Sequence, residues 1–189
     1  MENIILAGYG GHARSVADCI ERQREFNIIG YTDLKKYESP YTYLGNDDVL
    51  KKCYDNGIHN AAICIGYLGK GELRQNIYLS LKKIGFNLPV IIDPSAIVSK
   101  SAQINEGVFI GKGAIVNAEA KIGKAAIINS NALVEHGCSV GNFAHIAVSA
   151  VLCGQVKVGD FAFVGASSTI IQHREIHRNQ IIPAGSVVR

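Results

Sequence analysis

The chain has 189 residues, of which 48% are hydrophobic, and a formal net charge of +3. This length allows one large domain or two small ones with a buried core. The net charge is small and the Lys and Arg residues are scattered, so we expect no nucleic-acid partner. The slight basic excess suits an anionic small molecule.

The N-terminus and the cysteines exclude further classes. The chain runs directly into the apolar segment 3–6 without a basic leader, which predicts a cytoplasmic protein without a signal peptide. No apolar stretch approaches about 20 residues, so no membrane span is expected. The five cysteines contain no CxxC pair, which disfavours a disulfide framework and a thiolate metal site, and we expect no metal.

Residues 1–92 alternate short apolar runs with longer amphipathic segments. This alternation is typical of a small parallel α/β domain. Strands are predicted at 4–7, 28–31, 61–65 and 89–92, and helices over 13–20, 47–54 and 73–84.

A glycine-rich turn follows the first predicted strand. The segment Gly8-Tyr9-Gly10-Gly11-His12-Ala13 fits the pattern G-x-G-x-x-[GA], and Asp33 follows about 20 residues later. Glycines at such a turn let backbone N–H groups approach a phosphate at a helix N-terminus. We therefore expect a phosphate-bearing ligand here. The alternatives are a turn that only connects strand and helix, and a His12 that is merely exposed.

The second half, residues 93–189, carries a hexapeptide repeat. From Val98 to Ile170 an aliphatic residue occupies every sixth position without a miss, and a small residue usually lies four positions later. This pattern predicts a parallel β-helix of about four triangular coils. Gly or Asn often follows the aliphatic residue, as at Gly111, Asn117 and Gly123, and we expect left-handed backbone angles there.

One residue of each short strand must point outward, and these residues sort into three faces with a period of eighteen. The polar face carries Gln103, Lys121, Ser139 and Lys157; one apolar face carries Phe109, Ile127, His145 and Phe163; the other carries Ile115, Leu133, Val151 and Thr169. Two apolar faces are unusual on a soluble monomer, so we predict a homotrimer in which they meet. The alternative is that the α/β domain covers one of them.

Two histidines of the repeat are candidates for chemistry. His136 follows a corner, and His145 points outward from an apolar face where another Phe or Ile would be expected. Histidine can accept a proton near neutral pH. In a trimer, His136 of one chain and His145 of the next would share one cleft. The alternative for His136 is a solvated corner residue.

The chain resembles a known enzyme family in three segments: LAGYGGHARSVAD, VEHGCSVGNFAHIAVSAVLCGQVKVGDFAFVGASS and IIPAGSVV. They are similar to the sialic-acid O-acetyltransferase and UDP-4-amino-sugar N-acetyltransferase family. The resemblance implies a left-handed β-helix, a Rossmann-like domain that holds a nucleotide sugar, a homotrimer, and acetyl-CoA as co-substrate. The expected reaction is acetyl-CoA-dependent N-acetylation of a nucleotide-linked amino sugar.

The resemblance also implies roles for individual residues. Acetyl transfer needs a base for the acceptor's proton and a donor for the thioester oxyanion. By position, His136 matches the catalytic base and His145 the histidine beside the thioester. The nucleotide side corresponds to Gly10, Gly11, His12, Asp33 and Gly66, and the CoA groove to Gly154, Gly165 and Ala166.

The chain departs from this family in two places. Gly137 stands where an acidic residue usually follows the base, and Glu135, which precedes His136, is not assumed to replace it. The chain also ends at Arg189, where relatives continue, so part of the CoA groove is expected to be missing. Three alternatives stay open: an O-acetyltransferase of sialic acid or a related sugar, a non-catalytic nucleotide-binding or scaffold protein, and a nicotinamide-dependent oxidoreductase. The last leaves the repeat unexplained.

Overall fold

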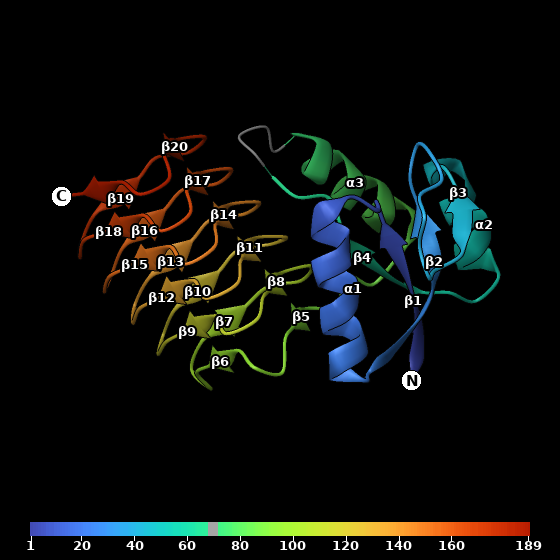
Figure 1. Ribbon diagram of the computed structural model, residues 1–189, viewed down its shortest axis with the longest axis horizontal. Helices are drawn as coiled ribbons and strands as arrows, with labels where there is room; N and C mark the ends of the chain where they lie inside the picture. The colour runs from blue at the N-terminus through green and yellow to red at the C-terminus, as the bar shows by residue number, and fades with distance from the viewer. Residues whose placement is uncertain (68–71) are drawn as a thin grey trace.

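The computed structural model describes residues 1–67 and 72–189, which form an α/β domain beside a left-handed parallel β-helix (Figure 1). The two parts lie side by side, and the C-terminus lies at the far end of the coil. Within the described residues, no helix is both long and apolar enough to cross a bilayer.

The α/β domain has three layers. Its elements are β1 (Glu2–Ala7), α1 (Gly11–Gln23), β2 (Phe26–Thr32), β3 (Tyr43–Gly45), a 3₁₀ turn (Asp47–Val49), α2 (Leu50–Asp55), β4 (Asn60–Ile63) and α3 (Glu72–Ile84). The sheet has the order β3-β2-β1-β4, and every pair is parallel, as predicted. Side chains alternate across β1, so Ile4 packs with α1 while Ile5 packs with α3.

Two details of this domain differ from the prediction. The three-residue strand β3 was not predicted, because it is too short to show an alternating pattern. The strand expected at 89–92 is β5 (Ile91–Ile92), and it pairs with β8 (Phe109–Ile110) of the coil instead of joining the α/β sheet. The coil therefore begins two residues ahead of the boundary that we predict after residue 92.

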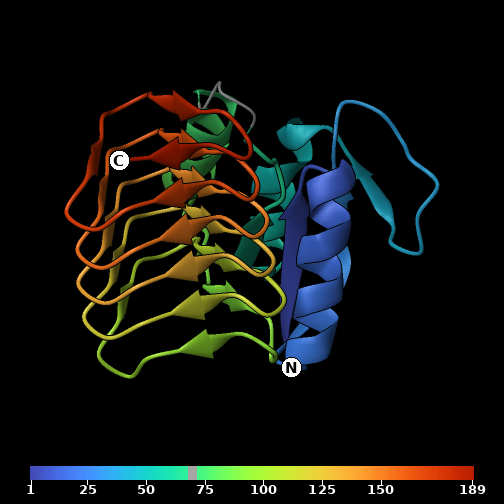
Figure 2. The same cartoon turned by 60° about the vertical axis from the view of Figure 1, so that its left-hand side comes forward.

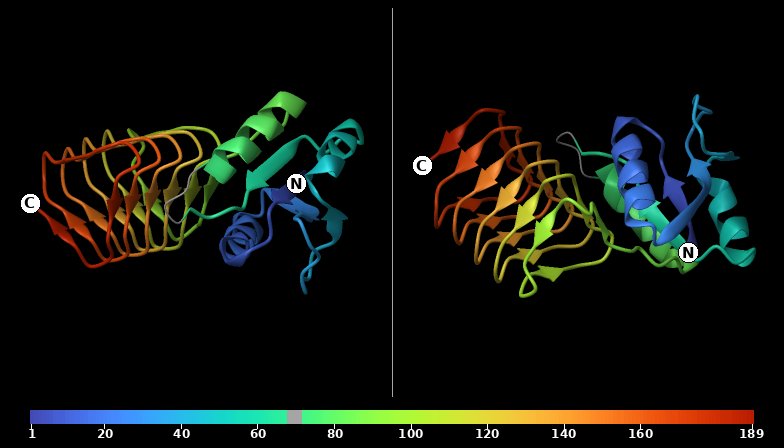
Figure 3. Two further views of the ribbon diagram at one scale, coloured as in Figure 1. Left: turned by 90° about the horizontal axis from the view of Figure 1, so that it is seen from above. Right: turned by 60° about the horizontal axis from the view of Figure 1, so that its bottom comes forward.

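The β-helix consists of two-residue strands stacked into three parallel sheets (Figures 2 and 3). The first sheet, here the covered face, contains β5, β8, β11 (Ile127–Ile128), β14 (His145–Ile146), β17 (Phe163–Val164) and β20 (Ile181–Ile182). The second, the open face, contains β6 (Ile97–Val98), β9 (Ile115–Val116), β12 (Leu133–Val134), β15 (Val151–Leu152), β18 (Thr169–Ile170) and β21 (Val187–Val188). The third, the polar face, contains β7 (Gln103–Ile104), β10 (Lys121–Ile122), β13 (Ser139–Val140), β16 (Lys157–Val158) and β19 (Glu175–Ile176).

Three corners join these faces. Corner 1, which includes 129–132 and 147–150, leads from the covered to the open face. Corner 2, which includes 135–138 and 153–156, leads from the open to the polar face. Corner 3, which includes 141–144 and 159–162, closes the coil.

The repeat is longer than predicted. It starts at Ile92 and continues past Ile170 through Ile176, Ile182 and Val188, so the coil makes about five turns instead of four. The period of six is unbroken across this whole length. Most inward residues are fully enclosed, including the predicted core residue Cys138, while those of the end coils, such as Ile92 and Val188, are partly buried.

The left-handed residues are not the ones we predicted. Positive φ angles fall three positions after the inward aliphatic residue, as at Ala125 (φ 51°) and Phe143 (φ 57°), whereas Gly123 and Gly141 do not have positive φ. Glycine at 141 meets a different need, because a Cβ there would lie 2.5 Å from the backbone nitrogen of Asp160 in the next coil. These glycines let neighbouring coils approach closely.

The α/β domain covers one apolar face of its own coil. Phe109 and Ile127 are buried in one core with α1, while Ala125, Phe143 and Phe161 pack with α3. The alternative that the α/β domain covers one face is therefore correct, and the argument for a trimer from two bare faces fails. The open face keeps partly exposed apolar side chains along its length, among them Leu133 and Val151, whereas on the covered face Phe163 and Ile181 are exposed in part toward the C-terminal end.

Candidate active site

The glycine turn is open to solvent at the start of α1. Gly8 has a φ of +94°, and Gly10 caps the helix without any side-chain hydrogen bond. A Cβ on Gly10 or Gly11 would meet nothing within 4 Å. Asp33 holds the turn from the end of β2, because its Oδ2 accepts the backbone N–H of Tyr9 at 2.8 Å. The turn therefore leaves free space in front of a helix N-terminus, where an anion is favoured.

A cavity of about 820 Å³ lies between this turn and corner 1 of the coil. Its lining brings together four of the five residues predicted for the nucleotide side, which are Gly10, Gly11, His12 and Gly66. It also contains His145, as well as Asn129, Ser130, Tyr67 and Cys64, which were not predicted. We call this space the acceptor cavity. Asp33 lines a smaller neighbouring cavity of about 320 Å³ instead.

His145 is held rigidly in the acceptor cavity by two hydrogen bonds. Its Nδ1 lies 2.8 Å from the carbonyl oxygen of Tyr67, which can only accept, so Nδ1 carries the proton. Its Nε2 lies 3.1 Å from Nδ2 of Asn129. The amide of Asn129 is oriented by Ser130, whose N–H donates to Oδ1 at 2.8 Å, so Nδ2 is the donor to Nε2.

These contacts bear on the role predicted for His145. Burial, despite the Tyr67 carbonyl, lowers the pKa of His145 to about 4, so the ring is neutral. With Nδ1 donating and Nε2 accepting, no N–H remains for a thioester oxygen. The predicted contact of His145 with acetyl-CoA thus does not fit this arrangement, and the ring instead forms part of the acceptor cavity.

His12 is the second neutral histidine of the cavity. Burial, followed by the nearby Arg74, lowers its pKa to about 3. Its Nε2 is buried and has no hydrogen-bond partner among the described residues. A buried ring nitrogen without a partner is costly unless a ligand group meets it.

His136 lies on corner 2 in a contrasting environment. Its side chain is 65% exposed, and its Nδ1 lies 3.1 Å from Oε2 of Glu135. The other carboxylate oxygen of Glu135 accepts from Nδ2 of Asn117 at 3.0 Å. The N–H groups of His136 and Asn117 hold the pKa of Glu135 below its usual range. An ionised carboxylate can only accept, so it places the proton on Nδ1 and leaves Nε2 of His136 free.

Gly154 lies directly against the imidazole of His136, one coil further along. A Cβ at Gly154 would come within 2.7 Å of Cε1 and Nε2 of the ring. Among the described residues, no acceptor takes the N–H of Gly154. A free backbone donor therefore lies beside the free nitrogen of His136.

The predicted site residues fall into two groups, which lie at opposite edges of the open face of the chain. His136 and Gly154 lie on corner 2, whereas the acceptor cavity, Gly165 and Ala166 lie on the side of corner 1. The two-residue strands of the open face separate the two corners, and equivalent corner positions are one six-residue repeat apart, at most about 20 Å along the chain.

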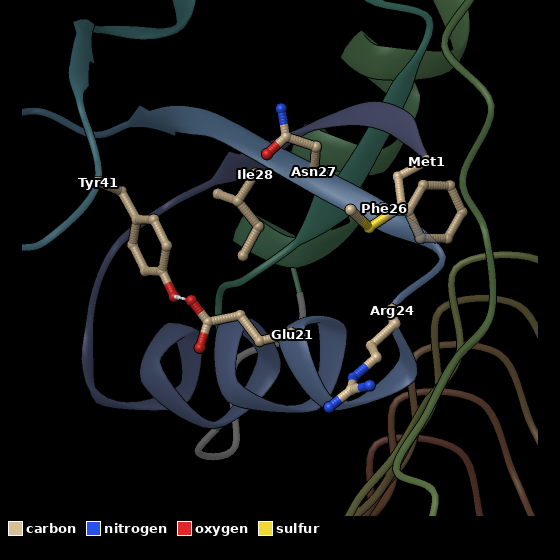
Figure 4. Close-up of a pocket in the computed structure, with 7 residues that line it drawn as sticks. All are labelled: Met1, Glu21, Arg24, Phe26, Asn27, Ile28 and Tyr41. Carbon is tan, nitrogen blue, oxygen red and sulfur yellow. Dashed lines mark hydrogen bonds between the residues drawn. The ribbon is translucent and has the colours of Figure 1, made fainter.

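A further cavity of about 390 Å³ lies at the opposite end of the α/β sheet (Figure 4). Its lining includes Met1 and Phe26, and Glu21 accepts the hydroxyl of Tyr41 at 2.7 Å. This cavity adjoins the amino end of β2, whereas ligands of parallel α/β sheets bind outside the carboxyl ends. The described residues contain no His, Cys, Asp or Glu cluster suited to a metal ion.

A hexapeptide β-helix beside a Rossmann-like domain, with an exposed histidine that lies against Gly154 of the next coil, is typical of an acyltransferase of the hexapeptide-repeat class. Comparisons with known proteins narrow this class. The family model of the PglD N-terminal domain matches residues 3–81. A search of the curated proteins finds no match.

Three solved structures are similar along the whole chain. A histidine-to-alanine mutant of GDP-perosamine N-acetyltransferase from Caulobacter crescentus, in complex with CoA and GDP-perosamine, is 31% identical, with a TM-score of 0.94 and coverage of 100% of this chain and 89% of that one. The acetyltransferase domain of PglB from Neisseria gonorrhoeae FA1090 is 26% identical, with a TM-score of 0.93 and coverage of 100% and 92%. PerB from Caulobacter crescentus, with CoA and GDP-perosamine, is 28% identical, with a TM-score of 0.78 and coverage of 100% and 89%.

The chain belongs to the hexapeptide-repeat sugar acetyltransferases. It is an acetyl-CoA-dependent enzyme, as the sequence predicted, and the oxidoreductase and scaffold alternatives are set aside. The contacts of Tyr67 and Asn129 with His145 leave no signal in the sequence, because any residue can offer a backbone carbonyl and Asn is common throughout the repeat.

Proposed function

We propose that the protein N-acetylates a nucleotide-linked amino sugar, with His136 as general base, in a homotrimer whose active sites each use two chains. The observation that carries this proposal is the Glu135–His136 pair beside the free N–H of Gly154. Each part rests on separate contacts.

The acceptor's nucleotide part suits the glycine turn and the acceptor cavity. The open space at Gly10 and Gly11 in front of α1 favours a diphosphate, and Asp33 faces the adjoining smaller cavity. Two of the similar structures contain GDP-perosamine, which is a nucleotide-linked amino sugar. The same class of acceptor is proposed here.

The base is proposed to work through the free nitrogen of His136. The amine nitrogen of the sugar attacks the thioester carbonyl carbon, and Nε2 of His136 takes the amine's proton. Glu135 keeps the ring oriented and stabilises the imidazolium that forms. When the tetrahedral intermediate collapses, the C–S bond breaks and the proton passes from His136 to the CoA thiolate.

The oxyanion of the intermediate needs a donor, and the N–H of Gly154 is the proposed one. It lies beside the ring that acts as base and has no acceptor within the described part of the chain. A positioned backbone donor of this kind typically contributes about 10²–10³-fold to rate. This assignment replaces His145, which has no N–H to offer.

The proposed trimer rests on one apolar face instead of two. If the open face of each chain points toward a threefold axis, corner 1 of one chain comes next to corner 2 of its neighbour. Gly165 and Ala166 of one chain and Gly154 of the next then border one cleft, where CoA would lie. The same contact would bring His136 to the neighbour's acceptor cavity and cover Leu133 and Val151.

A CoA-thiol release assay with a panel of UDP- and GDP-linked amino sugars tests the function. The matched controls are the corresponding sugars with a hydroxyl in place of the amine. Turnover of amino sugars alone supports N-acetylation. Turnover of the hydroxyl sugars, with a product that hydroxylamine cleaves, would replace it with O-acetylation. No turnover of any nucleotide sugar, while acetyl-CoA binds, would contradict the proposed acceptor class.

A further inference from the structure

Among the described residues, one arginine lies fully enclosed between the acceptor cavity and the coil. Arg74, on the first turn of α3, is 1% exposed. Its Nε donates to the carbonyl of Ala125 at 2.8 Å, and its Nη1 donates to the carbonyls of Ile63 at 2.9 Å and Ile65 at 2.6 Å. These contacts join the end of β4 to corner 3 of the coil.

The charge of this guanidinium is not matched by a carboxylate. All three of its acceptors are neutral carbonyl groups, and its Nη2 is buried without a partner among the described residues. Burial lowers the pKa of Arg74 only to about 10, so it stays charged at neutral pH. A buried and unpaired charge is expensive, which makes a purely structural role a poor explanation.

Arg74 stands directly behind the wall of the acceptor cavity. The two carbonyls that it binds belong to the segment that supplies Cys64, Ile65, Gly66 and Tyr67 to the lining. The described lining residues include no Lys, Arg, Asp or Glu. The guanidinium therefore acts on the cavity without any opposing charge in the lining.

The ionisable groups that line this cavity near Arg74 are all neutral. They are His12, His145, the thiol of Cys64, whose pKa burial raises to about 12, and the hydroxyl of Tyr67, whose pKa burial also raises. Arg74 adds to burial in lowering the pKa of both histidines. The positive potential of the cavity thus comes from Arg74 and the N-terminus of α1, and it does not depend on histidine protonation.

We propose that Arg74 is a positioning residue of the acceptor site: it clamps the wall 63–67 to the coil and supplies the positive charge that holds the acceptor's diphosphate. The inference rests on the proposed function, since it requires a nucleotide diphosphate in the cavity. It adds a residue that touches neither the sugar nor acetyl-CoA.

The test compares charged and uncharged probes by calorimetry at pH 8. The probes are UDP, GDP and inorganic pyrophosphate, with uridine and guanosine as uncharged partners. Arg74→Met should weaken UDP, GDP and pyrophosphate about tenfold or more, because the charge behind the cavity wall is lost. Binding of the nucleosides should change by less than about twofold, and Arg74→Lys, which keeps the charge, should fall between Arg74→Met and the wild type.

Two further variants separate charge from folding. Arg74→Gln keeps an N–H donor for the wall but has no charge. It should weaken the charged probes as expected for Arg74→Met, and it replaces Arg74→Met in the test if that variant does not fold. Arg22→Met removes another interdomain arginine, which pairs with Asp93 and does not line the acceptor cavity. It should leave the affinity for pyrophosphate and UDP unchanged.

A second readout follows the histidines by NMR. In Arg74→Met the pKa values of His12 and His145 should rise, though not fully, because burial remains. Diphosphate binding should then partly recover below pH 6 as the rings gain charge.

If the variants weakened UDP and uridine binding equally, or if both Arg74→Met and Arg74→Gln left the UDP affinity unchanged, the role of Arg74 would be wrong. The proposed function would not be affected by either result. If the wild-type protein bound none of the charged probes, the proposed acceptor site would fail with it.

Discussion

The two histidines of the coil differ in almost every physical respect. His145 is buried under the α/β domain, and both of its nitrogens are hydrogen-bonded. His136 is mostly exposed on corner 2, and only its Nδ1 is engaged, by Glu135. A ring with both nitrogens occupied can shape a cavity but cannot move a proton, whereas a ring with one oriented nitrogen and one free nitrogen can act as a base. A histidine can take either role, as a cavity-lining residue or as a base, and the exposure and hydrogen bonds of each ring indicate which one it suits.

The largest effect is expected when the imidazole of His136 is removed. His136→Ala should lower kcat by about 10²–10⁴-fold, the usual contribution of a general base, with little change in the KM for acetyl-CoA. Steady-state thiol-release kinetics would measure both constants. His177→Ala, at an exposed histidine of corner 3, is the control and should match the wild type. If His136→Ala keeps most of the activity, the base lies elsewhere.

The open face offers the next largest effect. Leu133→Lys with Val151→Lys puts two charges on the proposed interface, so the trimer should dissociate and kcat should fall by roughly 100-fold or more as shared sites are lost. Analytical ultracentrifugation at micromolar concentration would follow the assembly. The control is Ser139→Lys on the polar face, which should remain trimeric. A monomeric wild-type protein under these conditions would contradict the proposed assembly.

A smaller effect is expected at the carboxylate that orients His136. Glu135→Gln keeps the shape but loses the charge that stabilises the imidazolium, so kcat should fall about tenfold with an unchanged KM for acetyl-CoA. Gly137→Asp should not raise kcat in the wild type, since Glu135 already occupies Nδ1 and a side chain at the Gly137 φ of +66° is strained. A clear gain from Gly137→Asp would show that Glu135 does not serve this purpose.

The smallest effect concerns stability at low pH. The pKa of His145 is about 4 in the folded protein and close to 6.5 when unfolded, so the unfolded chain binds more protons between these values. Its contribution is therefore complete above pH 6.5 and decreases as the pH falls toward 4, by about 1 kcal/mol at pH 5.5. Urea unfolding at pH 7.5 and 5.5 should show a smaller loss for His145→Gln than for the wild type. Equal losses would mean that His145 is protonated in the native state.

The coil was easier to predict than the site because the same sequence pattern occurs in every coil. The inward aliphatic residues recur at every sixth position, so a single misread residue would not hide the pattern. Sorting with a period of eighteen also identified the three faces correctly. The corners were misread, because close approach between coils and left-handed geometry both favour glycine, and Gly141 and Gly137 look alike in sequence.

The site depended on contacts between distant parts of the chain. His145 was expected to face a neighbouring chain, but Tyr67 and Asn129 of its own chain hold it. Arg74 was not singled out at all, since an arginine on an amphipathic helix normally faces solvent. Only the packing of α3 against corner 3 shows that it is enclosed.

The central claim is that the base and the acceptor cavity of one active site come from two chains, and subunit mixing tests it most directly. His136→Ala removes the base, and Gly11→Val fills the open space at the glycine turn, so each homotrimer should be nearly inactive. In trimers assembled at random from equal amounts of both chains, about one quarter of the interfaces pair an intact base with an intact cavity. The account predicts that about one quarter of the wild-type activity returns on mixing. If the mixed trimers are no more active than the two parents, base and cavity belong to the same chain and the account is wrong.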